Sequence, residues 1–495
     1  MMIKRLYYLK IAIKVPFLAL AMMLLLIFKT SPIVYSQNLP LLPYPHQIIE
    51  HEGVFNMNEF VPVLRGRNAP LEEQRAIWML CEGFENIFGK PLKVTDKEKG
   101  RVIVLRNLTT EFPSKKQEKM ILPIGEEGYQ INIRPDKIEI IANNNAGLFY
   151  GSQTLLQLFR TSSLTGNINC MTINDMPSIS KRYLCYDWDF THVPTFNYIK
   201  QLIQCISHFK FNGIAFLNDS LSSPFAEMEL FYLKKFAEAY HVNIVTDTKG
   251  FSEGQILNVN LKYKIYPELQ QTLKTVFSSY AKEENKMTIF HNNAAALFMD
   301  NWYSIFWTAE LSWNQPKNNT VSNMKRQQVQ YEKALDRQFF DVDFALCELL
   351  KPFDSLQIIP LTEQVFWRSI ATTGISPAYS PTNNRFVLTR ALALEEKLQL
   401  LLESAPIMHD EIIYSMLFAA QRTGFIALKN LLQESLTQQS SEPQTVKETV
   451  SILLENIRHL KKAHETLWST ETDSAFPADI TQKYNQMILE LENTK

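Results

Sequence analysis

Residues 127–160 constrain the fold more than any other part of this sequence. Apolar and polar residues alternate over 129–133 and again over 137–141, and Pro135-Asp136 lies between the two runs. Alternation of this kind is typical of half-buried strands, and Pro-Asp is typical of a turn. The apolar positions that follow recur at helical spacing, at Leu148, Leu155, Leu156 and Phe159. The segment therefore predicts a strand-turn-strand-helix unit of a small α/β domain.

The order of residues in this segment is also typical of one protein family. EGY, an apolar strand and then AGLFYGSQTLLQL strongly resemble the end of the N-terminal α/β domain of bacterial β-N-acetylhexosaminidases of glycoside hydrolase family 20. A second stretch, LLPYPHQIIEHEGVFNM at residues 41–57, resembles the opening of the same domain. A helix at 71–88 and a strand at 101–105 are predicted between them. We therefore expect a hexosaminidase-like α/β domain over residues 37–172.

The following residues alternate predicted strands with predicted helices. Strands at 182–188, 213–217 and 243–246 are separated by amphipathic helices, which indicates parallel strands joined by right-handed crossovers. In the resembled family, a run like INDMP leads into the first strand of a (β/α)8 barrel. A helix at 267–282 and a strand at 286–290 come next, and NWYSIFWTAELSWN resembles the last unit of such barrels.

The length available for a barrel is short. Roughly 130 residues separate the first and last of these landmarks, whereas a complete barrel takes about 250. We therefore expect an incomplete or abbreviated TIM-like barrel over residues 173–320. Apolar residues at helical spacing then predict an α-helical C-terminal region over 321–495. The expected fold class is a multidomain α/β protein with these three parts.

Charge and the N-terminal residues limit the partners and the location. Lys plus Arg number 50 against 51 for Asp plus Glu, so no basic field favours nucleic acid. Basic residues precede an apolar run at 15–28, and small residues precede Gln37, which predicts a signal peptide over 1–36. The alternative is an uncleaved anchor, but an apolar run of about 14 residues is short for a bilayer span. We expect export to the periplasm, the cell envelope or the outside, with no stable membrane span after cleavage.

The sequence lacks the motifs of cofactor-dependent chemistry. Zinc-ligand spacing, phosphate-binding glycine loops and a Gly-x-Ser-x-Gly elbow do not occur in it. The five cysteines are scattered, and we expect most of them to be buried, with at most one disulfide. No cofactor and no metal are therefore expected.

The catalytic signature of the resembled family is missing. In that family the substrate acetamido group is the nucleophile, a glutamic acid protonates the leaving oxygen, and the preceding aspartate orients the acetamide. The sequence has one Asp-Glu pair, Asp410-Glu411, which lies in a predicted C-terminal helix without neighbouring glycines. Acidic residues at the positive end of a helix explain that pair better than catalysis does.

Other family positions are partly retained. Arg182 and Asp187 match an R-G-x-x-L-D pattern, but Phe190 stands where the family has a sugar-binding arginine. The motif H-W-H-L-T-D-D corresponds to IAFLNDS, which keeps Leu217 and Asp219. ALFMD resembles N-L-W-x-E and places Asp300 at the acid. These differences argue against the standard N-acetylglucosamine pocket.

Aspartates at strand ends are the candidates for a replacement acid. Asp187, Asp219 and Asp300 follow predicted strands, where catalytic residues of barrels lie, and Asp189 and Asp247 share this placement. Aspartates at such junctions are also common helix N-caps, so a structural role is the competing interpretation for each.

Tryptophans are the candidates for sugar stacking, because an aromatic face packs against the apolar face of a pyranose. The predicted substrate-binding residues are Arg182, Trp188, Trp302 and Trp313. Trp307 and Trp313 have an alternative role in the core.

Three functions remain open from the sequence. The first is an active glycosidase of the β-N-acetylhexosaminidase type with a rearranged site. The second is a catalytically inactive relative that binds a glycan or amino-sugar ligand. The third is an envelope scaffold whose helical tail binds a protein partner, which requires an exposed apolar patch on the helices.

Overall fold

The computed structural model describes residues 39–58, 62–64, 71–95, 97, 100–111, 122–188, 193–217, 223–246, 302–314, 321–340, 346–347, 363–371, 381–404, 410–438 and 442–494. The predicted signal peptide, the predicted helix at 267–282 and the predicted strand at 286–290 lie outside these residues. Residues 40–495 belong to one compact unit. None of the helices in the described residues combines the length and apolarity of a bilayer-spanning helix.

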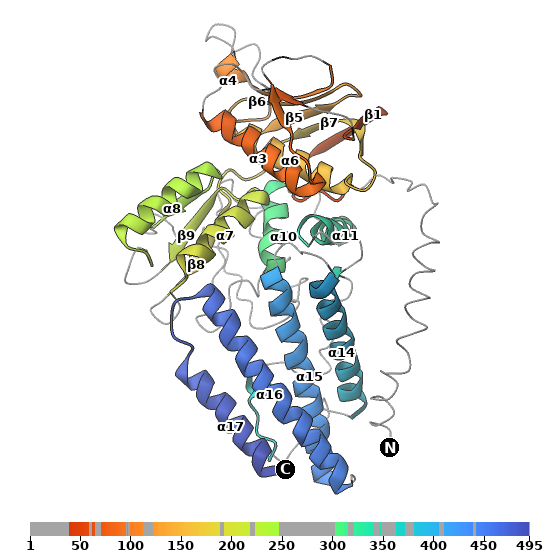
Figure 1. The fold of residues 1–495 in the computed structure, drawn as a ribbon, viewed down its shortest axis with the longest axis vertical. Helices are drawn as coiled ribbons and strands as arrows, with labels where there is room; N and C mark the ends of the chain where they lie inside the picture. Colours follow the sequence, from red (N-terminus) through yellow and green to blue (C-terminus); the bar gives the residue numbers. More distant parts are fainter. Residues whose placement is uncertain are drawn as a thin grey trace. The chain divides into compact units, whose positions relative to one another are not determined.

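The first part of this unit is a mixed sheet with helices packed on it (Figure 1). Its strand order is β1-β7-β5-β6-β4-β2-β3, with parallel pairing among the last four strands of this order and antiparallel pairing among the others. The strands are β1 (Gln47–Asn56), β2 (Pro62–Leu64), β3 (Lys93–Thr95), β4 (Val102–Asn107), β5 (Tyr129–Ile133), β6 (Lys137–Ala142) and β7 (Asn167–Asp175).

The predicted strand-turn-strand-helix unit is confirmed as β5, β6 and helix α6 (Asn145–Thr161). The alternating residues of β5 are buried as the pattern predicts. Asn144 caps α6 by accepting hydrogen bonds from the backbone N–H groups of Ala146 and Gly147. Gly151 lets α6 approach the sheet, because a Cβ there would lie 2.6 Å from Ile140 Cγ2. Close packing of this helix on the sheet therefore depends on a glycine.

The predicted helix at 71–88 is confirmed as α3 (Leu71–Phe88), and it packs against α6. Phe84 of α3 and Phe159 of α6 meet edge to face, with ring centroids 5.3 Å apart. A short helix, α4 (Leu108–Glu111), follows β4. The two long helices thus form the apolar layer that covers the sheet.

Two βα units follow, as the sequence predicts. Strands β8 (Tyr183–Asp187), β9 (Gly213–Leu217) and β10 (Asn243–Val245) are parallel, in the order β10-β9-β8. Helices α7 (Phe196–His208) and α8 (Glu227–Ala239) connect them. Within the described residues this sheet has three strands, and the incomplete or abbreviated barrel stays a prediction.

The described elements from residue 302 onward are helices, and a helical region was predicted from residue 321. The helices are α10 (Trp302–Trp313), α11 (Val321–Gln338), α13 (Glu363–Phe366), α14 (Pro381–Ser404), α15 (Asp410–Gln438), α16 (Pro443–Glu471) and α17 (Ala478–Thr494). Helices α14 to α17 pack against one another in chain order, and Figure 1 shows these long helices side by side.

One continuous apolar core joins the parallel strands to the helices. It contains Leu184 of β8, Ile203 of α7, Phe306 of α10 and Leu454 of α16. The buried positions of α16 recur every three or four residues, so one stripe of the helix faces this core. The predicted boundary at residue 320 stays a prediction, since the core extends across it. Of the cysteines whose side chains the structure describes, Cys170, Cys205 and Cys347 are buried, as expected, and Cys81 is partly exposed.

Candidate functional site

The carboxyl ends of the parallel strands define one candidate site. Asp187 is the last residue of β8 and pairs in register with Leu217, the last residue of β9. Barrel enzymes place their catalytic residues at this end of the strands. The other predicted acids, Asp219 and Asp300, lie outside the described residues, as do Asp189 and Asp247. Asp187 is thus the catalytic candidate that the described strands place at this edge.

The C-terminal helical region contacts the chain just beyond β8. Tyr186 Oη donates a 3.0 Å hydrogen bond to Glu471 Oε1 at the end of α16. Thr472 Oγ1 donates to the Val193 carbonyl at 2.6 Å, and the Asp473 N–H donates to the same carbonyl at 3.0 Å. These bonds hold Tyr186 and Val193 against the end of α16. Residues almost 300 positions apart therefore meet near the candidate edge.

Arg182 lies before β8 and is buried, with 1% of its surface exposed. Its guanidinium donates to Glu127 Oε2 at 2.8 Å and to the Ile179 carbonyl at 2.7 Å, and its Nε donates to the Lys210 carbonyl at 2.8 Å. The group also lies over the Trp313 ring, 5.0 Å from its centroid. These contacts hold the start of β8 against the first sheet, and sugar binding by Arg182 stays a prediction.

The predicted sugar-stacking tryptophans divide into two groups. Trp188 and Trp313 are buried, and so is Trp307, whose ring lies 4.8 Å from that of Tyr331. The core interpretation of Trp307 and Trp313 predicts this burial. Trp302 is the first residue of α10, and its side chain lies outside the described part of the structure. Stacking on a sugar stays a prediction for these residues.

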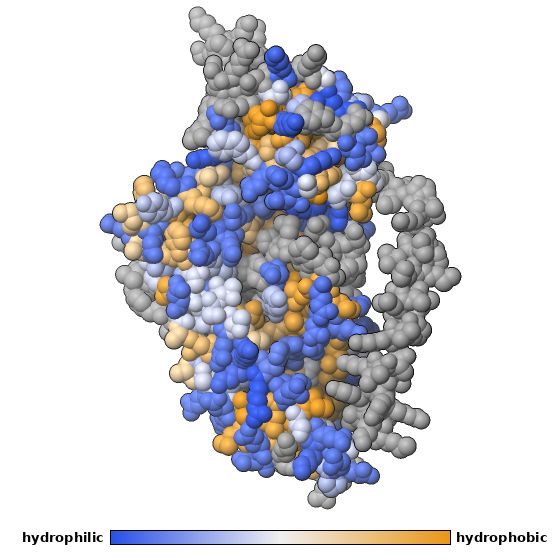
Figure 2. Space-filling view, viewed as in Figure 1, coloured by the Kyte–Doolittle hydropathy of each residue, from blue (hydrophilic) through white to orange (hydrophobic). Residues whose placement is uncertain are grey.

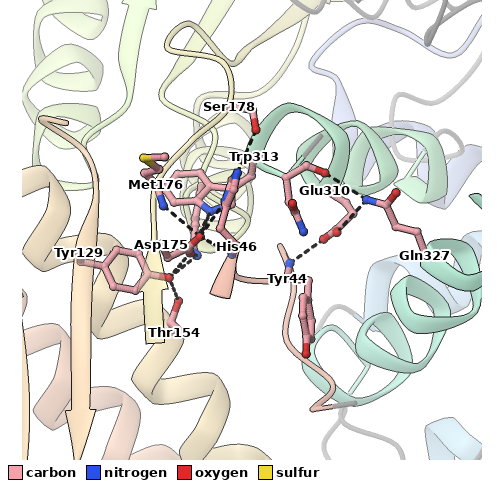
Figure 3. Close-up of polar contacts among 12 residues, drawn as sticks. Tyr44, His46, Tyr129, Thr154, Asp175, Met176, Ser178, Glu310, Trp313 and Gln327 are labelled. Carbon is pink, nitrogen blue, oxygen red and sulfur yellow. Dashed lines mark hydrogen bonds and ion pairs between the residues drawn. The ribbon is translucent and has the colours of Figure 1, made fainter. Parts of the chain in front are cut away.

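A buried polar cluster lies between the first sheet and the helices that follow (Figure 3). Asp175, the last residue of β7, is its centre. Lys210 Nζ lies 3.0 Å from Asp175 Oδ2, and Trp313 Nε1 donates to both carboxylate oxygens at 2.9 Å. Tyr129 Oη also donates to Asp175 Oδ2, and Tyr129 exchanges a 2.6 Å hydrogen bond with Thr154. Three side chains from separate parts of the chain, those of Lys210, Trp313 and Tyr129, therefore meet at one carboxylate.

The surroundings of Asp175 keep it ionised. Burial by itself would raise the pKa of this carboxyl, but the charge of Lys210 and hydrogen bonds from His46, Tyr129 and Trp313 outweigh burial and lower the pKa to about 2. A buried charge is stable when it is paired and fully hydrogen-bonded, and Asp175 meets both conditions.

The pKa of a second buried carboxyl, that of Glu310, is raised and not lowered. Glu310 of α10 accepts a 2.7 Å hydrogen bond from the Tyr44 N–H and a 3.3 Å bond from Gln327 Nε2 (Figure 3). Burial raises the pKa of Glu310 to about 7, although these two bonds and Lys210 oppose the rise. Glu310 therefore changes protonation near neutral pH.

The sequence did not single out Asp175, Lys210, Glu310 or His46 for a site. One signal was present, because Asp175 is the aspartate of the quoted INDMP run. Lys210 occupies a left-handed backbone conformation with φ of 63° after α7, which a sequence pattern does not reveal. Its partner is 35 positions away, so only the fold brings the two together.

Asp410 is the first residue of α15, and it is exposed. This position agrees with the interpretation of Asp410-Glu411 as a helix start. Within the described ranges, no group of three or more His, Cys, Asp or Glu side chains could hold a metal ion.

Exposed apolar residues on the C-terminal helices bear on the scaffold interpretation. Among the described residues of α14 to α17, the large ones are Phe386, Leu392, Leu400, Tyr414, Leu436, Ile452 and Leu489. Figure 2 shows hydrophobic residues interspersed with hydrophilic ones over this region of the face in view. A protein partner for the helical tail stays a prediction.

Comparison with known proteins identifies the first domain. Residues 38–176 match the family model described as glycosyl hydrolase family 20, domain 2. A search of curated proteins found no match.

Solved structures are similar at low identity. A Streptomyces plicatus N-acetyl-β-hexosaminidase in complex with Thio-NAglucal shares 18% identity over 43% of this chain and 46% of its own, with a TM-score of 0.36. A family 20 exo-β-N-acetylglucosaminidase from Vibrio harveyi shares 19% identity over 47% of this chain and 38% of its own, with a TM-score of 0.32. This chain thus spans less than half the length of these enzymes.

A third structure, CpGH84D, matches over 92% of this chain and 99% of its own, at 9% identity and a TM-score of 0.50. That similarity concerns the fold alone.

Proposed function

We propose that this chain, whose residues 38–176 match glycosyl hydrolase family 20, domain 2, acts on or binds glycans that contain N-acetylhexosamine. The site is the carboxyl edge of β8, β9 and β10, with Asp187 as the polar group that contacts the sugar. The observation that carries this proposal is the position of Asp187, at the carboxyl end of the first parallel strand after a family 20 domain 2.

The geometry supports a fixed site at this edge. Asp187 follows Tyr186, whose hydroxyl is bound to Glu471, and the Val193 carbonyl accepts bonds from Thr472 and Asp473. The backbone of a strand that is supported by such contacts keeps its position more precisely than that of an unsupported loop. A carboxylate hydrogen-bonds sugar hydroxyl or amide groups, or acts as an acid or as the group that orients an acetamide.

The predicted signal peptide at residues 1–36 supports export. We therefore place the proposed activity in the periplasm, the cell envelope or the exterior. The alternative function is an inactive glycan-binding relative, which uses the same edge without turnover.

Binding and turnover are tested together with the secreted form that starts at Gln37. Binding of N-acetylglucosamine, N-acetylgalactosamine and chitobiose is measured by calorimetry, and hydrolysis is measured with aryl β-N-acetylhexosaminides. Asp187→Asn is compared with Asp479→Asn, a control on α17 whose side chain is 68% exposed. The proposal predicts sugar binding that Asp187→Asn weakens at least tenfold, about 1.4 kcal/mol, and that Asp479→Asn leaves unchanged.

Turnover that disappears in Asp187→Asn would make Asp187 part of the catalytic machinery. Binding without turnover would establish the inactive glycan-binding alternative. Failure of the wild type to bind or hydrolyse any of these sugars would overturn the proposal, and binding unaffected by Asp187→Asn would overturn the assigned site.

A further inference from the structure

Ser178, His46 and Asp175 form a continuous hydrogen-bonded row (Figure 3). His46 Nδ1 lies 3.3 Å from Asp175 Oδ1, and His46 Nε2 lies 3.2 Å from Ser178 Oγ. The backbone N–H of His46 also donates to Asp175 Oδ1 at 3.1 Å, which fixes the ring beside the carboxylate. Each ring nitrogen therefore faces the partner that a nucleophile-base-acid row requires.

Solvent exposure increases along this row from Asp175 to Ser178, as catalysis by a nucleophilic serine requires. The Asp175 side chain is fully buried, the His46 side chain is 24% exposed, and Ser178 is exposed. The buried carboxylate is held by Trp313 and Lys210, so its position does not depend on His46. A buried acid, a half-buried imidazole and an exposed hydroxyl match the arrangement by which a base activates a serine.

The backbone around Ser178 is also fixed. The Ser178 N–H donates to the Trp313 carbonyl at 2.8 Å, and the next N–H, that of Ile179, donates to the Ser312 carbonyl at 3.0 Å. Asp175 and Ser178 are separated by two residues in the chain, of which Pro177 restricts the backbone. The serine is therefore presented from a segment anchored on both sides.

We propose that Ser178, His46 and Asp175 are an acyl-transfer site, with Ser178 as nucleophile, for exposed short-chain esters of alcohols. This site is separate from the sugar edge, because Ser178 precedes the amino end of β8 whereas Asp187 ends that strand. The proposal does not rest on the proposed glycan function.

The reaction has two balanced steps. Ser178 Oγ bonds to the ester carbonyl carbon while its proton passes to His46 Nε2, and the alcohol leaves with that proton as the carbon-oxygen bond breaks. Water, activated by the same nitrogen, then attacks the acyl-serine and releases the carboxylic acid and Ser178. Asp175 accepts the Nδ1 proton as a hydrogen bond throughout and stabilises the imidazolium.

The buried cations Lys210 and Arg182 are both bound to carboxylates. The site is therefore proposed for an uncharged ester. The described contacts supply base activation, for which an acceleration of about 10²-fold to 10⁴-fold is typical.

The test measures covalent labelling of Ser178 by a fluorophosphonate, located by peptide mass spectrometry, together with the burst of 4-nitrophenol from 4-nitrophenyl acetate. The variants are His46→Gln, which keeps a polar side chain that cannot accept the proton, and Ser178→Ala. Ser180→Ala is the matched control, because Ser180 is an exposed serine two residues away. Ser178 and Ser180 lie at exposed positions and the His46 side chain is 24% exposed, and circular dichroism of each variant verifies folding.

The proposal predicts labelling at Ser178 that is about 100-fold slower in His46→Gln and unchanged in Ser180→Ala. It also predicts a burst that Ser178→Ala abolishes. Equal labelling of Ser178 and Ser180 would overturn the proposal, and so would a labelling rate that His46→Gln does not change.

Discussion

The Lys210 ammonium lies 3.0 Å from a carboxylate oxygen of Asp175, and neither side chain is exposed to solvent. Asp175 is the last residue of β7 in the first sheet, whereas Lys210 follows α7, the first helix of the βα units. This ion pair therefore joins the family 20-like domain to the strands that carry the candidate sugar edge. Removal of one partner leaves the other as an uncompensated buried charge.

Lys210→Met should destabilise the protein by roughly 3–5 kcal/mol, because Asp175 then loses its buried counterion. The double variant Asp175→Asn with Lys210→Met should be more stable than Lys210→Met alone, since it carries no buried charge at this position. Urea unfolding of both variants and the wild type at pH 7 measures the difference. A Lys210→Met variant within about 0.5 kcal/mol of the wild type, the additivity error of such comparisons, would contradict this account.

Glu310 should make stability fall as pH rises from about 4.5 to 7. Burial raises its pKa to about 7 from the usual 4.5, so across this interval the folded state binds more protons than the unfolded state. The full difference is on the order of 3 kcal/mol. Glu310→Gln keeps an acceptor for the Tyr44 N–H but does not titrate, and it should remove this contribution.

Unfolding free energies at several pH values between 4.5 and 7 measure that change in slope. Glu238→Gln is the control, because the Glu238 side chain is 58% exposed. If Glu310→Gln and Glu238→Gln give the same slope as the wild type, Glu310 does not titrate as described.

Local patterns in the sequence predicted the elements well where one face of each element is buried. The alternation in β5 reports contact of one face with the core, whereas the middle of β6 and residues 147–159 of α6 are buried without interruption. The position of Asp187 at a strand end follows from the same signal. The predicted helix at 71–88 matches α3 residue for residue.

The buried cluster could not be predicted in this way. Asp175 contacts Trp313, which is 138 positions away in the sequence, and Lys210, which is 35 positions away. The pattern of residues along the sequence does not predict such pairs. Arg182 matched a family motif, but its contacts with Glu127 depend on how the first sheet packs against β8. Asp219 and Asp300 stay predictions, because they lie outside the described residues.

Tyr186→Phe should destabilise the protein by about 1–3 kcal/mol, because it removes a buried hydroxyl that donates to the buried Glu471 carboxylate. Tyr183→Phe is a matched control on the same strand, since the Tyr183 hydroxyl accepts a 3.3 Å bond from Asn243 at an exposed position. The control should change stability by less than about 0.5 kcal/mol. Thermal unfolding compares the two variants. Equal losses of stability would show that the hydrogen bond from Tyr186 to Glu471 stabilises the protein no more than the exposed bond of Tyr183 does.

His464 should make the protein sensitive to acid. Its Nδ1 lies 3.2 Å from Tyr484 Oη, and its ring packs between Phe418 and Phe476 at 5.1 and 5.0 Å. Burial, with a smaller effect of Arg422, lowers the pKa of His464 to about 3 from the usual 6.5. Between these values the unfolded state binds the additional proton, so stability is lost as pH falls below about 6.5.

The loss approaches about 1.4 kcal/mol per pH unit, the most that one group can contribute. His464→Gln should remove this dependence between about pH 6.5 and 4.5, even where the variant is less stable at pH 7. His51→Gln is the control, because His51 is exposed and bonds only at the surface to Thr172. The sign is opposite to that of Glu310, so the two variants must change the slope in opposite directions. Parallel changes would mean that another group dominates the acid response.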